Sequence, residues 1–582
     1  MKKLKKIYLV NLCLLLCFSI GETCIFMREF ILSADRSQVS NFRGNFLFGF
    51  LSCGPAKVSP RPIYSMICPT WDTFNKNTGE LLLAPLGLRR IQESLTHRFG
   101  NENVLAQHPN RIHQAVNEDT KIIGLTEMSP LGIGTVDTAI SWSNDPWNRE
   151  WFIRLTKTLK GLKERYKFKV VVGGPGSWQL LRPFTDYMRR ADTPRSRESR
   201  VEFKSELSGG KKGEIDPWVK NELGVDYVVE GEADVTAPFI FQSIMDDDPP
   251  EVIRSMTNSI LSLEDIPVIT RPTLTGTIEI MRGCGRGCDF CAPNLRTKRD
   301  FPIDRLVREA KRNIAVGQKA IWLLTEELTL YGCDNKEKIP NGDKIVELFR
   351  SLKNAGAEKI GATHWTFAGV RAAPETISEL SKINNLGPDS WMGVQPGLEF
   401  ISPRLIRKYM PYKMKPYSPE EFPETVKEAV KIMNRNYYYP AITLVVGHPE
   451  EQDDEVDMTT SFIDELSNGV GLKGIIAPLL YVDYYKPERS MDYDMMNEHH
   501  WRLYYTAWKH NARQFNQDIW LATQSFGLIS RYATIMGTYA ISGVIMRFLR
   551  SQFRKRFGYT PDWMTSTSKK DQPSSSITGV KI

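Results

Sequence analysis

The sequence predicts an α/β protein with three structured parts: a doubly wound parallel-sheet domain, a partial (βα)6 barrel and a mainly helical C-terminal region. Short apolar runs alternate with helical patterns over residues 120–245, and the same alternation resumes over residues 272–460. Strands that alternate with helices form parallel sheets, because a crossover helix must bring the chain back to the same end of the sheet. Residues 480–557 are aromatic and mixed in charge, with helical spacing.

Length and composition agree with a globular protein of about two to four domains. The chain has 582 residues, of which 41% are hydrophobic and 25% charged, and its net charge is +8. It contains no basic block of the kind that binds nucleic acid, so no nucleic-acid partner is expected. We divide the chain into five segments: a hydrophobic N-terminal extension (1–44), the sheet domain (45–250), the barrel (270–470), the helical region (471–560) and a disordered tail (561–582).

The first domain is predicted from apolar runs that end in small or polar loops. A strand-like apolar run at the start of the domain and three buried-type strands are expected, together with two helices and one charged, Gly/Ser-rich loop or disordered insertion. The expected strands are 45–52, 121–125, 167–174 and 226–232, the helices are 83–94 and 146–166, and the insertion is 189–214.

The barrel is predicted in the same way, with about six strands rather than eight. In βα barrels the chemistry lies at the carboxyl ends of the strands. The expected strands are 276–281, 320–324, 359–367, 391–394 and 441–446, and the helices are 301–316, 340–355, 403–410 and 423–434. Farther on, residues 529–548 are apolar but interrupted by arginine and glycine, so a packed core helix is favoured over a membrane helix.

Three cysteines follow the first barrel strand directly: Cys284, Cys288 and Cys291, spaced C-x3-C-x2-C. Three thiolates this close can hold three irons of a [4Fe–4S] cluster, in which each iron takes one thiolate. The next cysteine, Cys333, lies more than forty residues on, so one iron is left open to a substrate or cofactor. A structural zinc site is the alternative, but zinc requires four closed ligands and no further Cys or His stands at suitable spacing.

This spacing, with Phe290 before the last cysteine, resembles the radical SAM superfamily, in which the open iron chelates S-adenosylmethionine (SAM). The resemblance implies SAM contacts at the ends of later strands. Residues 325–327 match the position of the motif that contacts the SAM amino group, and 397–404 resemble a G-x-E-S-G-S segment, although Phe400 and Ile401 depart from it. The SAM contacts implied are Phe290, Glu326, Glu399, Ser402 and Val446, and His448 either contacts the substrate or supports a residue that does.

The upstream, Rossmann-like domain resembles the cobalamin (B12)-binding domain that is fused to many radical SAM proteins. Glycines at strand ends let a large planar ligand approach the backbone. The D-x-H-x-x-G motif that supplies an axial histidine is missing, so cobalamin would bind without a histidine from this domain, or cobalamin binding has been lost. The cobalamin contacts implied are Thr126, Ser129, Gly173, Gly174, Pro175, Glu230, Gly231 and Glu232.

Together these resemblances imply a cobalamin-dependent radical SAM methyltransferase that acts on an unactivated carbon. The best match within the family is the archaeal type that methylates a glutamine carbon of methyl-coenzyme M reductase, and the helical C-terminal region and basic surface suit a protein or peptide substrate. A ferredoxin or flavodoxin would donate the electron. The alternatives are a radical SAM cyclase or rearrangement enzyme that uses cobalamin non-catalytically, and a non-catalytic Fe–S/B12 sensor. A methylthiotransferase is disfavoured because a second three-cysteine set is not evident.

Further side chains are candidates for the substrate pocket or a radical relay, although core or rim positions are favoured for each. They are Tyr331, Cys333, Tyr481, Asp483, Tyr484 and Tyr485.

The N-terminus conflicts with this chemistry. Residues 1–6 are basic and 7–21 apolar, about the length of a signal peptide and too short to span a bilayer comfortably. Three interpretations are open: a signal peptide, a membrane tether, or an over-extended gene start with the initiator at Met27 or nearby. A cluster with an open iron needs a reducing compartment, so we favour the third interpretation and expect a cytoplasmic protein.

Overall fold

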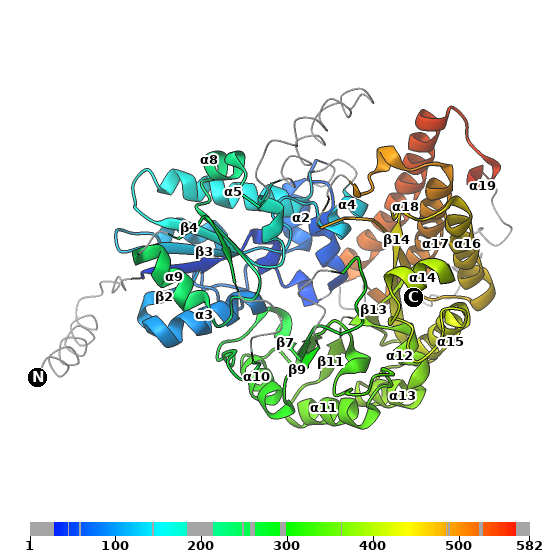
Figure 1. The fold of residues 1–582 in the computed structure, drawn as a ribbon, viewed down its shortest axis with the longest axis horizontal. Helices are drawn as coiled ribbons and strands as arrows, with labels where there is room; N and C mark the ends of the chain where they lie inside the picture. Colours follow the sequence, from blue (N-terminus) through cyan, green and yellow to red (C-terminus); the bar gives the residue numbers. More distant parts are fainter. Residues whose placement is uncertain are drawn as a thin grey trace, which may run out of the picture.

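The structure is a computed structural model that describes residues 28–565 except 45, 58–59, 142–144, 183–212, 247–248, 256–261, 292–297, 363, 485, 487–488 and 523–527. Two α/β units lie side by side, and a layer of long helices covers the far edge of the second unit (Figure 1). The predicted hydrophobic start and the end of the tail lie outside the described residues, as does most of the predicted insertion 189–214.

The first domain is built on a six-stranded sheet in the order β2-β1-β3-β4-β5-β6, in which every pairing is parallel. The chain order reverses between β1 and β3, which makes their carboxyl ends a switch point where ligands bind in such sheets. The strands are β1 (Phe30–Ser33), β2 (Val104–Ala106), β3 (Ile122–Thr126), β4 (Lys169–Gly173), β5 (Tyr227–Glu230) and β6 (Val252–Arg254).

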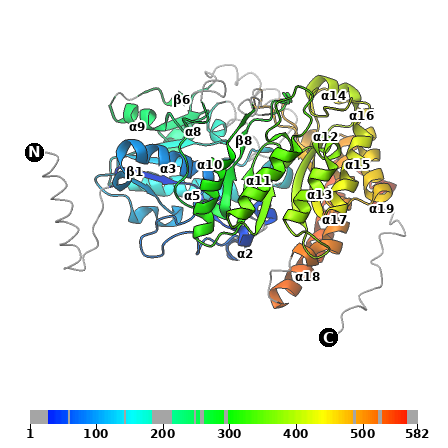
Figure 2. The same ribbon diagram turned by 90° about the horizontal axis from the view of Figure 1, so that it is seen from below.

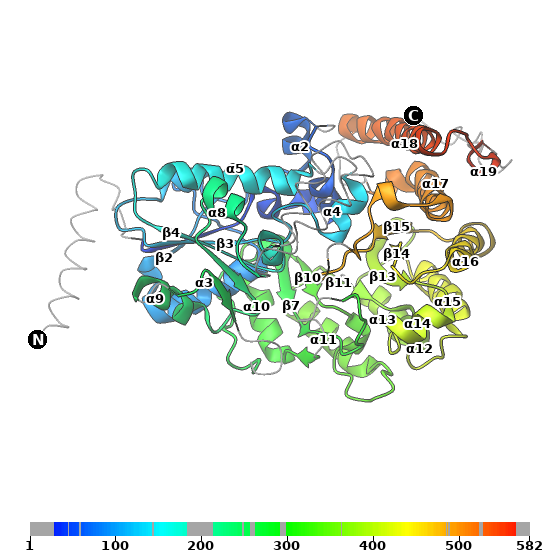
Figure 3. The same ribbon diagram turned by 45° about the horizontal axis from the view of Figure 1, so that its top comes forward.

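Helices cover both faces of this sheet, as Figure 3 shows. Along β4, Val170 and Val172 pack into the core beneath α5 (Trp147–Leu162) and α8 (Pro217–Leu223). Val171 points the other way, into the core beneath α3 (Leu86–Phe99) and α9 (Ala237–Asp246). Because alternate side chains of a strand point to opposite faces, an uninterrupted apolar run predicts a strand buried on both sides. The doubly wound prediction is therefore confirmed.

One predicted strand of this domain is wrong. Within the predicted strand 45–52, residues 46–52 belong to a 3-10 helix, η3 (Phe46–Cys53). The first strand is β1, which lies between β2 and β3 in the sheet but within the segment 1–44 that we had assigned to an extension. An apolar run without alternation does not separate strand from helix, and a strand of four residues is too short to show a period.

The barrel is formed by six strand positions, and its parallel order confirms the partial (βα)6 prediction. β7, β10 and β11 make one sheet, and β12, β13, β14 and β15 make another, with only residue 363 between β11 and β12. β15 was not predicted. The strands are β7 (Thr277–Glu279), β10 (Ala320–Leu324), β11 (Lys359–Ala362), β12 (His364–Trp365), β13 (Met392–Glu399), β14 (Tyr438–Val446) and β15 (Ile475–Leu480).

The crossover helices follow one another along the outer side of the barrel (Figure 2). α15 shows why they form: Phe422, Val426, Ala429, Val430 and Met433 are buried on one face, the spacing of an amphipathic helix. The barrel helices are α10 (Ile303–Ala315), α11 (Gly342–Asn354), α12 (Phe367–Ala372), α13 (Pro374–Ile383), α14 (Pro403–Tyr409), α15 (Phe422–Arg435) and α16 (Asp453–Asp464).

The C-terminal region is helical, as predicted. α17 (Glu498–Ala522) packs on α16 and β15, and α18 (Leu528–Phe557) packs on α17, before the short α19 (Asp562–Thr565). Helix α18 contains the apolar stretch 529–548. Within the described part of the chain, none of the helices combines the length and the apolarity that crossing a membrane requires.

Candidate active site

The three cysteines lie in a loop that leaves the barrel at the carboxyl end of β7. The loop begins after β8 (Met281–Arg282), which pairs antiparallel with β9 (Arg299–Asp300). Gly283, Gly285 and Gly287 have φ angles of 67°, 66° and 64°, a left-handed conformation that side chains other than glycine adopt at a cost. Every second residue therefore turns the chain back, which coils the loop tightly and explains the alternation of glycine with Cys284, Arg286 and Cys288.

The thiols of this loop suit a cluster better than a single ion. Among the described residues, no three His, Cys, Asp or Glu side chains converge on one metal-ion position. A [4Fe–4S] cluster does not require convergence, because each thiolate binds a different iron. Burial raises the pKa of Cys288 to about 11 and that of Cys291 to about 12, where the charges of Cys284 and Cys288 add to the shift. Metal binding would deprotonate these thiols.

Arg286 anchors the loop to the barrel. Its guanidinium is buried and donates from Nε and Nη2 to the Glu327 carboxylate at 2.5 and 2.7 Å, and from Nη1 to the carbonyl oxygen of Tyr412 at 2.7 Å. Glu327 also accepts from the hydroxyls of Thr329 and Thr366. We did not predict this pair. The sequence did contain a signal for it: Arg286 stands between the predicted ligands Cys284 and Cys288, and a guanidinium buried there requires a carboxylate nearby.

Glu326, one residue earlier, turns toward the same loop. Burial and the charge of Glu279 raise its pKa to about 7, although hydrogen bonds from the backbone N–H groups of Glu326 and Gly283 act to lower it. Its Oε2 atom is buried and has no hydrogen-bond partner among the residues that the structure describes. A buried carboxylate oxygen without a donor fits a positively charged group such as the amino group of SAM.

Glu399 lies at the carboxyl end of β13, after an irregularity in the pairing of β13 with β14. Its backbone has φ 59°, which is uncommon for a residue other than glycine and is typical of functional sites. The carboxylate accepts from the ammonium of Lys413 at 2.6 Å and from the hydroxyl of Thr443 at 3.2 Å. Lys413 was missed by sequence reasoning, since it lies in a loop without a motif.

The other predicted SAM contacts surround this point. Ser402 caps α14 and donates to Glu455 at 2.5 Å, so its hydroxyl is already engaged with the protein. Val446 is buried at the end of β14. Phe290 packs edge-on against Phe400, with ring centroids 5.9 Å apart, so the departure from the small-polar motif at Phe400 supplies an aromatic contact for the cysteine loop.

His448 belongs to an aromatic cluster beside the loop. Its ring lies 5.5 Å from Phe400, 4.1 Å from Tyr409 and 4.8 Å from Tyr481, measured between centroids. Burial lowers the pKa of His448 to about 4, so the imidazole is neutral at physiological pH, and its Nδ1 accepts from the backbone N–H of Glu450.

The remaining candidates divide between core and interface. Tyr331 donates to the carbonyl of Phe301 and Cys333 to that of Ile339, both within the barrel core. Asp483 accepts from the backbone N–H of Lys486. Tyr484 packs edge-on against Trp178 of the first domain at 5.0 Å, and Tyr485 lies outside the described residues.

A small cavity of about 70 Å³ lies at the carboxyl edge of the first sheet, between α3 and α9. Four of the predicted cobalamin contacts line it: Thr126, Gly173, Gly174 and Gly231. The remaining walls are small or apolar side chains, such as Ala233 and Ala237. The cavity fits a narrow, largely apolar end of a ligand, and its glycines keep side chains out of the way.

The other predicted cobalamin contacts have protein partners or lie apart from the cavity. Ser129 accepts from Gln179 at 3.1 Å, and Glu230 pairs with Arg254 at 3.4 Å. Pro175 is not among the residues that line the cavity.

Glu232 belongs instead to an ionic cluster that joins the two domains. Arg282, directly before the cysteine loop, donates from Nη1 to Glu232 at 2.8 Å, from Nη2 to Asp234 at 2.8 Å and from Nε to Glu279 at 2.7 Å. Arg299 of β9 donates to the other oxygen of Glu232 at 2.5 Å. Since Gly231 and Ala233 line the first-domain cavity, the loop that bounds this cavity is bonded directly to the loop that carries the cysteines.

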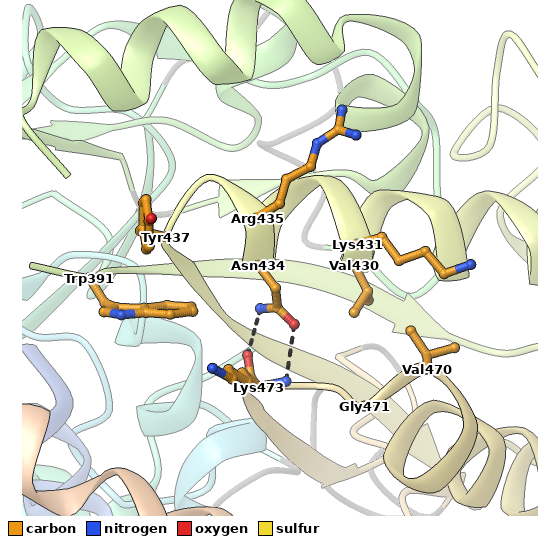
Figure 4. A pocket seen from close by; sticks show the side chains of 9 residues that line it. All are labelled: Trp391, Val430, Lys431, Asn434, Arg435, Tyr437, Val470, Gly471 and Lys473. Atoms are coloured by element: carbon orange, nitrogen blue, oxygen red, sulfur yellow. Dashed lines mark hydrogen bonds between the residues drawn. The ribbon is translucent and has the colours of Figure 1, made fainter. Parts of the chain in front are cut away.

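A larger hollow of about 300 Å³ lies at the opposite end of the barrel, beside Trp391, Tyr437 and Lys473 (Figure 4). Its exposed Lys431 and Arg435 side chains point in different directions. It adjoins the amino ends of β13, β14 and β15, where barrels rarely carry out chemistry, so we do not assign it a role.

Comparison with known proteins identifies the barrel. The radical SAM superfamily matches residues 278–463. The ribosomal protein uS12 methylthiotransferase RimO of Cytophaga hutchinsonii is 27% identical over 205 residues, which are 34% of this chain and 42% of the relative. The tRNA-2-methylthio-N(6)-dimethylallyladenosine synthase of Syntrophomonas wolfei is 26% identical over 211 residues, 35% of this chain and 43% of the relative. The chain thus spans less than half the length of these relatives.

Among solved structures, the radical SAM methyltransferase TsrM of Kitasatospora setae, with cobalamin and a [4Fe–4S] cluster bound, is 13% identical. The match covers 78% of this chain and 72% of that chain, with a TM-score of 0.44. This likeness is too weak to transfer a function.

Proposed function

Because residues 278–463 form a radical SAM domain, we propose that this protein is a radical SAM methyltransferase that methylates an unactivated carbon with the help of a corrinoid held by the first domain. We propose a protein or peptide as the substrate and a ferredoxin or flavodoxin as the electron donor. Methylation at such a carbon needs radical chemistry, because no side-chain base can remove the proton.

The chain's own residues would divide the work as follows. When bound, a [4Fe–4S] cluster supplies the electron that splits SAM into methionine and a 5′-deoxyadenosyl radical. Cys284, Cys288 and Cys291 would hold it, and Glu326 would accept from the SAM amino group with its unpartnered oxygen. Glu399, held by Lys413, would approach the sugar. The neutral His448 and its aromatic neighbours would exclude water on one side.

The observation that carries the corrinoid part of the proposal is the ionic cluster around Arg282. The same short loop, 230–234, bounds the first-domain cavity and bonds to the start of the cysteine loop. Two ligands at these places would lie at the facing edges of two parallel sheets, where such sheets bind their ligands. A methyl carrier and a radical generator must reach the same substrate, which this junction favours.

Anaerobic reconstitution tests the proposal. The protein would be loaded with iron, sulfide and hydroxocobalamin, freed of unbound corrinoid, and incubated with methyl-labelled SAM, a reductant and candidate peptides. We expect bound corrinoid, 5′-deoxyadenosine and label in the peptide. Absence of bound corrinoid would remove the methyl-carrier mechanism, and label only in SAM-derived products would favour a cyclase or rearrangement enzyme.

A methylthiotransferase is the second candidate, because the curated relatives named above carry out that reaction. It would require a second cluster. Among the described residues, Cys53 lies beside Asn148 and Cys68 is buried near Arg36, and neither stands in a closely spaced set of three cysteines like that of Cys284, Cys288 and Cys291. Iron analysis separates the two candidates: about four irons per chain supports one cluster, whereas about eight supports methylthiolation.

A further inference from the structure

Lys413 places a buried positive charge beside the cysteine loop. Its side chain is 12% exposed and donates to Glu399 at 2.6 Å. The ammonium lies 6.0 Å from the centroid of the Phe290 ring, whose residue directly precedes Cys291. A side chain at Gly397 would put its Cβ 2.4 Å from the Lys413 nitrogen, so the glycine there leaves the space that the ammonium occupies.

The ammonium, rather than the carboxylate, is the end of this pair that lies against the cysteine loop. Burial alone would lower the pKa of Lys413, but Glu399 and the cysteines Cys288 and Cys284 outweigh it and raise the pKa. The ammonium lies over the Phe290 ring of the cysteine loop, whereas the Glu399 carboxylate that it contacts also accepts from Thr443 of β14. The pair is therefore a dipole whose positive end faces the cysteine loop.

The arginines near the cysteine loop are each held by carboxylates. The guanidinium of Arg286 is matched by two hydrogen bonds to Glu327. The Arg282 guanidinium is surrounded by Glu279, Glu232 and Asp234. Glu326 is itself an acid. Arg286 therefore adds to the positive field at Cys284 and Cys288, and Lys413 is the cation that lies beside Phe290, next to Cys291.

We propose that Lys413 is a positioning residue that raises the reduction potential of the cluster held by Cys284, Cys288 and Cys291. The inference rests on the assignment of these cysteines as ligands. Reduction moves one electron from a low-potential donor, which is oxidised, to the cluster, and breaks no bond. The added negative charge lies close to a fixed positive one in a region of low dielectric, so the reduced state gains more than the oxidised state.

The test is a redox titration of the reconstituted protein without SAM, followed by electron paramagnetic resonance. At one fixed applied potential, Lys413→Met is expected to lower the ratio of reduced to oxidised cluster at least tenfold. For one electron this corresponds to a midpoint potential lower by about 59 mV. Lys413→Arg should restore most of the ratio. The matched control is Lys415→Met, since Lys415 lies two residues on, is more exposed and pairs with Glu337; it should leave the ratio unchanged. A Lys413→Met protein with full iron and an unchanged potential would overturn the proposal.

Glu399→Gln keeps the proposal testable if Lys413→Met fails to assemble a cluster. This change removes the compensating negative charge and leaves the ammonium in place, so the reduced fraction should rise; an equal or lower fraction would contradict the proposal. Failure of the ligand assignment has a different signature: single alanine variants of Cys284, Cys288 and Cys291 would retain a complete cluster.

Discussion

Replacing Arg286 by Met should loosen the cysteine loop more than any surface change. The substitution leaves Glu327, which is 1% exposed in its side chain, as a buried carboxylate without its cation. Removing one partner of a buried ion pair costs about 3–5 kcal/mol. Because Thr329 and Thr366 still donate to Glu327, we expect the lower end, about 3 kcal/mol.

Hydrogen exchange followed by mass spectrometry measures this effect locally, which matters because a multidomain chain does not unfold in two states. A local loss of about 3 kcal/mol corresponds to roughly a hundredfold faster exchange in peptides that cover residues 283–291. The double variant Arg286→Met with Glu327→Met should recover most of the protection, since an apolar pair removes the buried charge. Arg350→Met is the control, because Arg350 makes a largely exposed pair with Glu379.

The pH dependence gives a second check. In the native protein, burial would raise the pKa of Glu327, but Arg286 outweighs burial and lowers it, so the pair contributes stability above the unfolded pKa that is lost as pH falls. In Arg286→Met, burial raises the pKa of Glu327 and only the Thr329 and Thr366 hydroxyls oppose it. The deficit should therefore shrink toward low pH as Glu327 takes up a proton. Exchange within threefold of the native rate at pH 8 would refute the reasoning.

Three further predictions concern other parts of the site. Glu326→Gln should weaken SAM binding to the oxidised cluster by about tenfold or more, measured by calorimetry, because a charged hydrogen bond is lost; equal affinity would exclude the assigned contact. Gly174→Ala should destabilise the first domain by about 1–2 kcal/mol and abolish corrinoid retention. Gly174 has φ 97°, and a Cβ there would lie 2.7 Å from the backbone of Glu127. The control is Gly161→Ala, because a Cβ at Gly161 would meet no neighbouring residue within 4 Å. Burial raises the pKa of Glu451 to about 8, so its contribution to stability is lost as pH rises from about 4.5 to 8. Glu451→Gln should therefore have a higher Tm than the native protein at pH 8.5 but not at pH 5. A Tm difference that is the same at both pH values would contradict this.

The elements that the sequence predicted well are long or carry dense local signals. The run 320–324 became β10 without a shift, because five residues between two amphipathic helices leave few alternatives. The cysteine loop was recognisable because its spacing, glycines and aromatic residue all stand within ten positions. In contrast, β1, β2 and β6 have three or four residues each, and such short strands are defined by their neighbours in the sheet rather than by a period.

The side chains that sequence reasoning missed act through partners that are distant along the chain. Arg286 meets Glu327 across 41 residues, and Arg282 meets Asp234 across 48. Lys413 lies in a loop between α14 and α15, where nothing in the local sequence distinguishes it from the more exposed Lys415. Buried charge pairs of this kind are specified by the fold that brings them together.

The cluster of charges around Arg282 also limits how freely the two halves of this protein can be exchanged with those of other proteins. A chimaera that carries a foreign first domain would need acids at the positions of Glu232 and Asp234. Without them Arg282 would keep Glu279 but lose its other two acids, and Arg299 would lose Glu232. Conversely, a foreign barrel joined to this first domain would need basic residues at the positions of Arg282 and Arg299. We therefore expect a domain exchange at this junction to succeed only when all four charged positions, 232, 234, 282 and 299, are kept together.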